Sequence, residues 1–203
     1  MSETEPLSEA DFENNPFEQF NKWYSLRNTA SIAIPDSVSL GTASSEGRVS
    51  VRTVLLKGYD NRGFVFFTNY KSRKSVDLIT NPMAALLFYW PECGWQIRIE
   101  GRIEKTSEEE SELYFASRPW ESQVSAWASE QSSVIPDRKY LDHNFEYFKS
   151  LFAGQSVDKP PCWGGFRLLP DWFEFWQDGG FRLHDRIAYR KTDDIWFMER
   201  LAP

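Results

Sequence analysis

Strand-like runs that are not regularly separated by helices constrain the fold of this chain more than any other feature. Residues 95–105 alternate polar and apolar side chains, as a strand buried on one face does. Residues 83–90 are almost continuously apolar, which is typical of a strand buried on both faces, and Ser45-Glu46-Gly47 predicts a hairpin turn. The predicted strands are 37–44, 48–57, 64–69, 83–90, 95–105, 163–169, 173–177, 186–190 and 195–201.

Helices are predicted around these strands at residues 16–28, 72–80, 107–117, 122–129 and 137–152. The third begins with a capping box, because Ser107 is followed three residues later by Glu110. Since strands and helices do not alternate, a doubly wound parallel sheet is disfavoured. The sequence predicts a mainly β chain with peripheral helices (α+β), arranged as a small antiparallel barrel. Residues 16–203 would form a single domain, preceded by a flexible leader, residues 1–15, that has little to bury.

Several classes of protein are disfavoured by what the sequence lacks. No apolar run approaches the roughly 18 residues that cross a bilayer, so no membrane association is expected. The polar start shows neither a signal nor a transit pattern. Cys93 and Cys162 make no disulfide framework, which favours a reducing compartment and predicts a cytoplasmic protein. With only His143 and His184 to join these cysteines, no metal site is expected.

The charge distribution points to a small anion rather than to nucleic acid. A net charge of −7 argues against nucleic-acid binding, because such proteins usually carry a basic surface. Residues 48–74 nevertheless hold seven Lys and Arg against one acid, Asp60. A cationic segment in an acidic protein suggests a local site for a small anion. The alternative is that exposed strand edges and turns carry these cations for solubility.

Familiar catalytic motifs are absent from the sequence. The chain has no G-x-G-x-x-G turn, no G-x-x-x-x-G-K-[ST] phosphate loop and no G-x-S-x-G elbow. Neither cysteine has neighbours that would activate a thiolate. The run Glu108-Glu109-Glu110 indicates a solvated helix face rather than an acid–base pair.

Three clusters instead combine cations with hydroxyl or aromatic side chains. They are Ser72-Arg73-Lys74, then Tyr114, Arg118 and Ser122, and finally Arg182, His184 and Arg186. The first stands at a predicted helix start and would hold a phosphate, unless it is only a charged cap. The second has i, i+4, i+8 spacing and would suit a second phosphate if the helix persists through Pro119; the alternative is an ordinary helix edge. The third would share one face if its segment is extended, which is costly unless an anion or cavity lies opposite; the alternative is a structural histidine.

The order of these clusters resembles the pyridoxamine 5′-phosphate oxidase (pyridoxine 5′-phosphate oxidase) family, from about Pro16 to the C-terminus. The motifs that carry the resemblance are RTVLLK at 52–57, TN at 68–69, SRK at 72–74, QIRIEG at 96–101, SRP at 117–119, SQ at 122–123, QSS at 131–133, WGG at 163–165, EFWQ at 174–177 and RLHDR at 182–186. They indicate this family more closely than flavin-binding split barrels in general.

The resemblance implies an FMN-binding split β-barrel that forms a homodimer, with FMN in the cleft between the subunits. FMN would contact Arg52, Thr53, Val54, Leu55, Leu56, Lys57, Phe67, Thr68, Arg73, Lys74, Gln96, Gln131, Ser132, Trp176 and Arg186. The substrate would contact Lys57, Tyr114, Arg118, Ser122, Arg182 and His184. Arg73 and Lys74 resemble the cations of the FMN phosphate site, and Lys57, Tyr114, Arg118 and Ser122 resemble the clamp of the substrate phosphate.

The activity implied is the FMN-dependent oxidation of pyridoxamine 5′-phosphate and pyridoxine 5′-phosphate to pyridoxal 5′-phosphate. A hydride would leave the 4′ carbon for flavin N5, and O₂ would reoxidise FMN to give H₂O₂. Arg182 and His184 would be the catalytic residues, lying over the pyridine ring. Two alternatives stay open: a split barrel that keeps FMN or pyridoxal phosphate without turnover, and a flavin reductase that uses a nicotinamide donor.

Three positions depart from the family pattern. Phe67 stands where Tyr is common, Trp120 where a basic residue is common and Trp95 where Arg is common. The resemblance therefore implies that a hydroxyl contact is lost at Phe67, that the rim of the substrate site changes at Trp120, and that a cation near the flavin is in question at Trp95.

Overall fold

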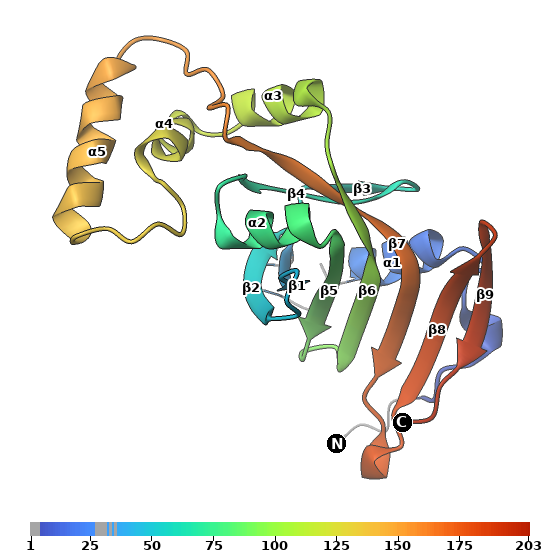
Figure 1. The fold of residues 1–203 in the computed structure, drawn as a ribbon. Helices are drawn as coiled ribbons and strands as arrows, with labels where there is room; N and C mark the ends of the chain where they lie inside the picture. The colour runs from blue at the N-terminus through green and yellow to red at the C-terminus, as the bar shows by residue number, and fades with distance from the viewer. Residues whose placement is uncertain (1–4, 27–31, 33, 35) are drawn as a thin grey trace.

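The computed structural model describes residues 5–26, 32, 34 and 36–203. Within these residues, nine strands form one antiparallel sheet that curls into a half-barrel (Figure 1). The order across the sheet is β2-β1-β5-β6-β7-β4-β3, with β8 paired to β7 and β9 paired to β8. The strands are β1 Ser37–Ala43, β2 Val49–Leu55, β3 Gly58–Asp60, β4 Gly63–Asn69, β5 Met83–Trp90, β6 Trp95–Lys105, β7 Trp163–Gln177, β8 Asp185–Thr192 and β9 Ile195–Arg200. The predicted fold class is confirmed.

Strand β7 organises the sheet because partners occupy both of its edges. One edge pairs with β6; the other pairs with β4 near the start of the strand and with β8 near its end. The register between β6 and β7 shifts at Gly101, where an added Cβ would collide with the main chain of Leu169 and Pro170. This bulge accommodates Pro170, which cannot donate to a ladder, inside a long strand.

The described helices lie on one face of the sheet and beyond one end of it. They are α1 Pro16–Leu26, α2 Arg73–Thr80, α3 Glu108–Ala116, α4 Trp120–Ala128 and α5 Arg138–Leu151, with short 3₁₀ turns η1 Glu9–Asp11 and η3 Gly180–Arg182. Helix α2 lies beside β1, and α4 and α5 form an arm that extends away from the sheet (Figure 1). None of the described helices is long and apolar enough to cross a membrane.

Helix α1 closes the main core against the inner face of the sheet. Phe20 is fully buried, with its ring centroid 4.8 Å from Phe64, 4.9 Å from Tyr59 and 5.3 Å from Phe88. A second, smaller apolar cluster joins the arm to the start of β7; its buried members are Phe115, Val124, Val157 and Trp163. Trp163 of this second cluster also lines the cavity described below.

The described part of the N-terminal segment, residues 5–15, packs against the C-terminal strands. The main-chain N–H of Leu7 donates to Asp185 Oδ2 at 3.0 Å, and Tyr189 Oη donates to the carbonyl of Glu13 at 2.6 Å. Arg200 on β9 donates to Glu9 Oε1 at 2.7 Å, which holds the pKa of the Glu9 carboxyl at about 2. The prediction of a loose leader did not anticipate these contacts.

Most element boundaries agree with the sequence-based predictions, and the differences have physical causes. Residues 83–90 are a strand, but within the single chain only one face is buried, because Met83 and Tyr89 on the other face are exposed; the prediction of burial on both faces is wrong for the single chain. The strands predicted at 163–169 and 173–177 are one strand, β7. The predicted helix 16–28 is described only to Leu26, and residues 27 and 28 lie outside the described chain.

Candidate active site

A cavity of about 690 Å³ lies where β2 and β4 meet the arm, within the usual volume of a small-molecule site. Its lining includes three cations, Lys57, Lys74 and Arg118, and no Asp or Glu. No ion pair to any of the three is found among the residues that the structure describes. In a protein of net charge −7, a cavity whose charged lining residues are all cations favours the binding of an anion.

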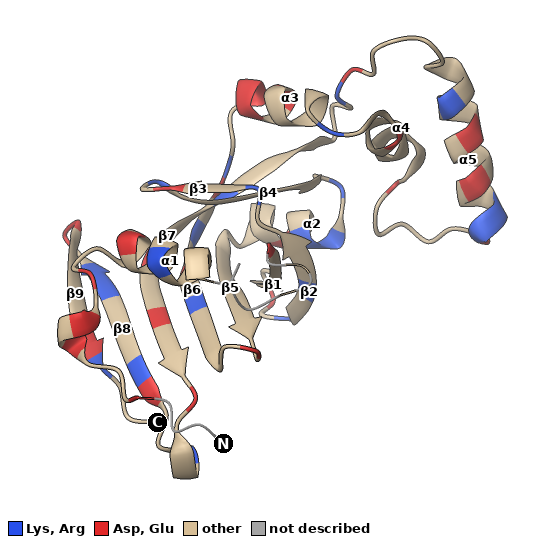
Figure 2. Ribbon diagram, turned by 180° about the vertical axis from the view of Figure 1, so that it is seen from behind, with Lys and Arg blue, Asp and Glu red and all other residues tan. Residues whose placement is uncertain are grey.

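Lys74, in the first turn of α2, lies at one end of this cavity. Lys74 Nζ lies 3.0 Å from Thr68 Oγ1 and 2.8 Å from Gln131 Oε1. Burial, with the nearby Arg52 charge, lowers the pKa of Lys74 to about 8. The N–H of Arg73 donates to Ser132 Oγ at 3.2 Å. Figure 2 shows basic positions at the start of α2.

The turn between α3 and α4 forms the other end. Tyr114, Arg118 and Ser122 all line the cavity, although they are not on one continuous helix, because α3 ends at Ala116 and α4 begins after Pro119. The Gln123 side chain bridges the break, since its Nε2 donates to the carbonyls of Ala116 and Arg118. The predicted site required one helix that continues through Pro119, and the structure shows that this helix is broken. The turn between α3 and α4 nevertheless brings the three side chains together.

Arg118 is held by aromatic rings rather than by a carboxylate. Its guanidinium carbon lies 4.8 Å from the Trp163 ring centroid and 5.4 Å from that of Phe115, a cation–π arrangement. Burial lowers the pKa of Arg118. Its Nη1 is buried and has no hydrogen-bond partner among the described residues. A buried, unpaired guanidinium nitrogen is costly, which favours an anionic ligand at this point.

Five other predicted site residues, the second group, lie in a second region, on β6, β7 and β8 and in the segment just before β8: Gln96, Trp176, Arg182, His184 and Arg186. Gln96, Trp176 and Arg186 are directly opposite one another across the three strands, and the His184 ring lies 4.7 Å from the Trp176 ring. None of them, nor Arg182, lines the cavity. Gly164 pairs with Thr68 at the cavity, and Trp176 is twelve residues further along β7, roughly 40 Å of strand. The two groups are therefore far apart within a single chain.

The loop before β8 has an unusual backbone. Phe181 and Arg182 both have positive φ, 57° and 64°, and the Phe181 side chain is fully exposed. Such conformations are costly for residues with a side chain and are concentrated at functional sites. The backbone thus turns Arg182 away from a regular strand path before His184.

Besides the second group, four residues predicted to contact FMN do not line the cavity: Arg52, Leu56, Arg73 and Ser132. The Arg52 guanidinium donates to Thr42 Oγ1 at 2.7 Å and lies 3.9 Å from Asp77. It therefore connects β2 to β1 and to helix α2. Leu56 is buried in the main core. By contrast, Thr53, Val54, Leu55, Lys57, Phe67, Thr68, Lys74 and Gln131 line the cavity as the prediction requires.

Some lining residues were not predicted. They are Asn69, Pro119, Ser125, Ala126, Ser129 and Trp163. Ser125, Ala126 and Ser129 follow Ser122 at spacings of three, four and seven, so extending the predicted helix face would have found them. No comparable pattern pointed to Asn69 as a lining residue.

The three departures from the family pattern have structural roles. The Phe67 ring stacks on Tyr114 with centroids 4.1 Å apart, so it positions the Tyr114 ring. Trp120 Nε1 donates to the carbonyl of Gln155, which ties the start of α4 to the following segment. Trp95 stacks on Trp23, with centroids 4.6 Å apart, and so joins β6 to α1.

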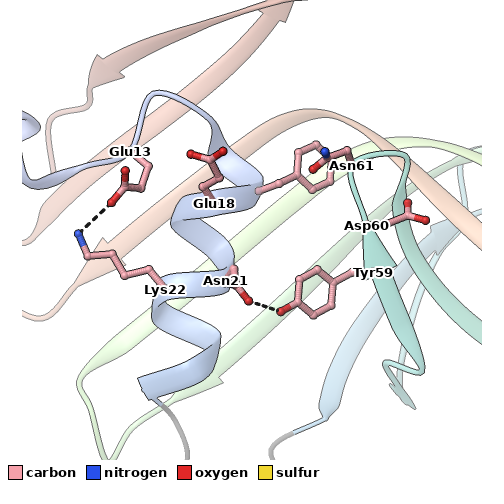
Figure 3. A pocket seen from close by; sticks show the side chains of 8 residues that line it. Glu13, Glu18, Asn21, Lys22, Tyr59, Asp60 and Asn61 are labelled. Atoms are coloured by element: carbon pink, nitrogen blue, oxygen red, sulfur yellow. Dashed lines mark hydrogen bonds and ion pairs between the residues drawn. The ribbon is translucent and has the colours of Figure 1, made fainter.

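A second hollow, of about 470 Å³, lies between α1 and the β3–β4 turn (Figure 3). Its polar groups pair with one another: Lys22 Nζ lies 3.4 Å from Glu13 Oε1, and Tyr59 Oη donates to Asn21 Oδ1 at 2.8 Å. Carboxylates from Glu13, Glu18 and Asp60 line it. These charges disfavour an anion, and no predicted site residue lies there.

Known proteins match this chain along nearly its whole length. The family model described as pyridoxamine 5′-phosphate oxidase matches residues 29–152. A second model, described as the pyridoxine 5′-phosphate oxidase C-terminal dimerisation region, matches residues 163–203. The chain is 51% identical to a pyridoxine/pyridoxamine 5′-phosphate oxidase of Burkholderia lata, covering 97% of this chain and 93% of that protein. It is 46% identical to one from Gloeothece citriformis, covering 97% and 92%.

Solved structures share the fold. PhzG from Burkholderia lata, in complex with tetrahydrophenazine-1-carboxylic acid, superposes with a TM-score of 0.92 at 30% identity and covers all of both chains. A pyridoxamine 5′-phosphate oxidase-related, FMN-binding protein from Nostoc punctiforme gives a TM-score of 0.72 at 16% identity, covering 91% of this chain and 96% of that one. The second likeness concerns the fold alone.

Proposed function

From the premise that this chain belongs to the pyridoxamine 5′-phosphate oxidase family of FMN-dependent oxidoreductases, we propose that it oxidises pyridoxamine 5′-phosphate and pyridoxine 5′-phosphate to pyridoxal 5′-phosphate. O₂ is the acceptor and H₂O₂ the product. FMN is the cofactor of this family, and the α2 end of the cavity fits its phosphate, because hydroxyl, amide and ammonium donors converge there.

The observation that carries the proposal is the acid-free cavity with an unpaired, buried Arg118 nitrogen opposite the α2 end. A single phosphate at Lys74 would leave Arg118 without a counter-ion. A second phosphate, on the substrate, satisfies it together with Lys57, Tyr114 and Ser122. The two ends of one cavity then bind the phosphates of two molecules whose rings meet between them.

The second group of residues enters this site from the partner subunit, in our proposal. Most of that group lies in the matched dimerisation region, residues 163–203. Exposed apolar side chains share the face that carries Gln96, Trp176 and Arg186; they are Val49, Val51, Met83 and Tyr89. Contact between two such faces covers this apolar surface and brings the flavin-contacting row to the partner's cavity.

The chain's own residues bind and orient. When bound, FMN supplies the redox chemistry by accepting a hydride and passing electrons to O₂. Lys57, Tyr114, Arg118 and Ser122 hold the substrate phosphate, which is remote from the bond that changes. Arg182 and His184 lie over the substrate ring and direct its reacting carbon towards the flavin, so their contribution is orientation.

A second candidate substrate comes from the structural match to PhzG, whose structure contains tetrahydrophenazine-1-carboxylic acid. Such a ligand carries one carboxylate and no phosphate. The four-residue clamp suits a phosphate dianion better, and the relatives named pyridoxine/pyridoxamine 5′-phosphate oxidase are about half identical to this chain, against 30% for PhzG. Both arguments favour the vitamin B6 substrates.

The test uses the purified holoenzyme in air. Pyridoxamine 5′-phosphate, pyridoxine 5′-phosphate, unphosphorylated pyridoxamine and a reduced phenazine carboxylate are supplied separately, and aldehyde absorbance and H₂O₂ are followed. We expect stoichiometric aldehyde and peroxide from the two phosphate esters, and a KM at least tenfold higher without the phosphate. Turnover of the phenazine alone would replace the proposed substrate. Bound flavin without any turnover would indicate a binding protein, and flavin reduction by a nicotinamide donor alone would indicate a reductase.

A further inference from the structure

Glu174 is a buried carboxylate in the middle of β7 that no role above uses. Its side chain is only 3% exposed. It lies between two cations on the neighbouring strands: Arg186 Nε donates to Glu174 Oε1 at 2.9 Å, and Arg98 Nη1 lies 3.1 Å from Glu174 Oε2. The Arg98 contact is an ion pair without hydrogen-bond geometry, because Oε2 has no hydrogen-bond partner among the described residues.

The contacts of Arg186 fix the plane of its guanidinium. Nε is bound to Glu174, and Nη1 donates to the carbonyl of Ala202 at 2.9 Å. The main chain is fixed as well, because the N–H of Leu201 donates to the Arg186 carbonyl. Nη2 makes no hydrogen bond within the described residues. Because Nε and Nη1 are held by hydrogen bonds and Nη2 has none, the guanidinium is oriented with one nitrogen available to a ligand.

Stability alone explains this carboxylate poorly. Desolvating a carboxylate costs several kcal/mol, and replacing a buried ion pair with apolar side chains is often neutral or stabilising. Glu174 is moreover directly opposite Arg98 and one row away from the Gln96–Trp176–Arg186 row. Without it, Arg98 would keep its contact with Glu100, whereas no carboxylate among the described residues would contact Arg186.

We infer that Glu174 is a positioning residue, which holds the Arg186 guanidinium in the orientation that binds FMN. The inference rests on the proposed contact between Arg186 and FMN, and not on the identity of the substrate. Glu174 acts only through Arg186. Its loss therefore weakens FMN binding when Arg186 is present and changes little when Arg186 is absent.

A double-mutant cycle tests this relation. The FMN dissociation constant is measured by quenching of flavin fluorescence for the wild-type dimer, Glu174→Gln, Arg186→Gln and the double variant. We expect Glu174→Gln to raise the constant about tenfold, as loss of an outer partner typically does, and to have less than a twofold effect in the Arg186→Gln background. Equal effects in both backgrounds, or none in the wild-type background, would overturn the inference.

The cycle also separates the inference from its premise. If Arg186→Gln leaves FMN affinity unchanged, the proposed contact between Arg186 and FMN is wrong. If Arg186→Gln weakens FMN binding but Glu174→Gln does not, the positioning role of Glu174 is wrong. Asp60→Asn is the matched control, because it removes a carboxylate that lies 3.2 Å from an arginine outside the proposed site, Arg167 on β7; it is expected to lower the melting temperature without changing FMN affinity.

A measurement on the unaltered protein covers the case in which Glu174→Gln does not fold. The Arg186 Nε–H proton, observed by ¹⁵N NMR in the FMN-free dimer, is expected to exchange with solvent at least tenfold more slowly than that of Arg48, an exposed arginine whose side chain has no hydrogen bond among the described residues. Exchange as fast as that of Arg48 would show that Arg186 is not held, and would overturn the inference as well.

Discussion

The guanidinium of Arg118 lies 4.8 Å from the ring of Trp163, and one of its buried nitrogens has no hydrogen-bond partner among the described residues. Trp163 is the first residue of β7, so the sheet itself fixes the cation. The guanidinium is thus fixed in place before a ligand arrives, which reduces the entropy that binding must overcome.

Replacing Arg118 with alanine tests the phosphate clamp. We expect the KM for pyridoxamine 5′-phosphate to rise by about tenfold to a hundredfold, because a charge-assisted hydrogen bond contributes about 1.5–3 kcal/mol, while kcat changes by less than threefold. Arg138→Ala is the control, since Arg138 is an exposed arginine of the arm. An unchanged KM for Arg118→Ala would contradict the clamp.

The lowered pKa of Lys74 predicts that FMN binding depends on pH. Its pKa of about 8 is below the ordinary value of 10.5 because the ammonium is buried. FMN phosphate binds the protonated form, so FMN affinity should be full below pH 8 and should fall as pH rises above it, by up to about tenfold per unit. Lys74→Arg, which stays charged, should abolish the decline between pH 8 and 9.5. A flat profile for the wild-type protein would exclude Lys74 as the phosphate's partner.

Arg182 is expected to act on turnover rather than on flavin retention. In Arg182→Ala we expect kcat to fall about a hundredfold, a loss typical of misplaced reacting groups, and FMN affinity to change by less than threefold. Steady-state kinetics and flavin titration on the same preparation provide both values. Loss of FMN in proportion to the loss of turnover would assign Arg182 to cofactor binding instead.

Mixing two variants, each of low activity at low substrate concentration, tests whether the site is shared between subunits. Arg118→Ala damages the cavity and Arg182→Ala damages the second group, so a mixed dimer has one intact site and one doubly altered site. After random exchange of subunits, we expect activity to recover to about a quarter of the wild-type value, at a substrate concentration well below the KM of Arg118→Ala. Activity no higher than the mean of the two parents would place the whole site within one chain.

The sequence predicted the elements of this fold well because alternation and capping are local signals. Residues 95–105 and the Ser107 capping box were predicted from side chains that lie within a few positions of one another, and both are present. Strand β7 was divided in two because Pro170 normally ends a strand. The compensating bulge depends on Gly101, about 70 residues earlier in the chain, and no local pattern reports such a pairing.

The site was predictable in composition but not in arrangement. The resemblance named both clusters that are proposed to bind phosphate, and the cavity lining brings together Lys74, Arg118 and their neighbours. It did not show that Arg52 turns towards Asp77 or that Leu56 enters the core. Those outcomes depend on which face of β2 is covered, and a strand with apolar side chains on both faces does not specify this.

The length of β7 has a consequence for any two-fold assembly of this chain. Its first residue, Trp163, belongs to the wall of one cavity, and Trp176 near its end belongs to the row proposed to serve the other. In the proposed dimer, each protomer would thus contribute one strand, with a bulge opposite Gly101, that extends from one site to the other. A change in the length of β7 or in its bulge is therefore expected to displace residues of both proposed sites.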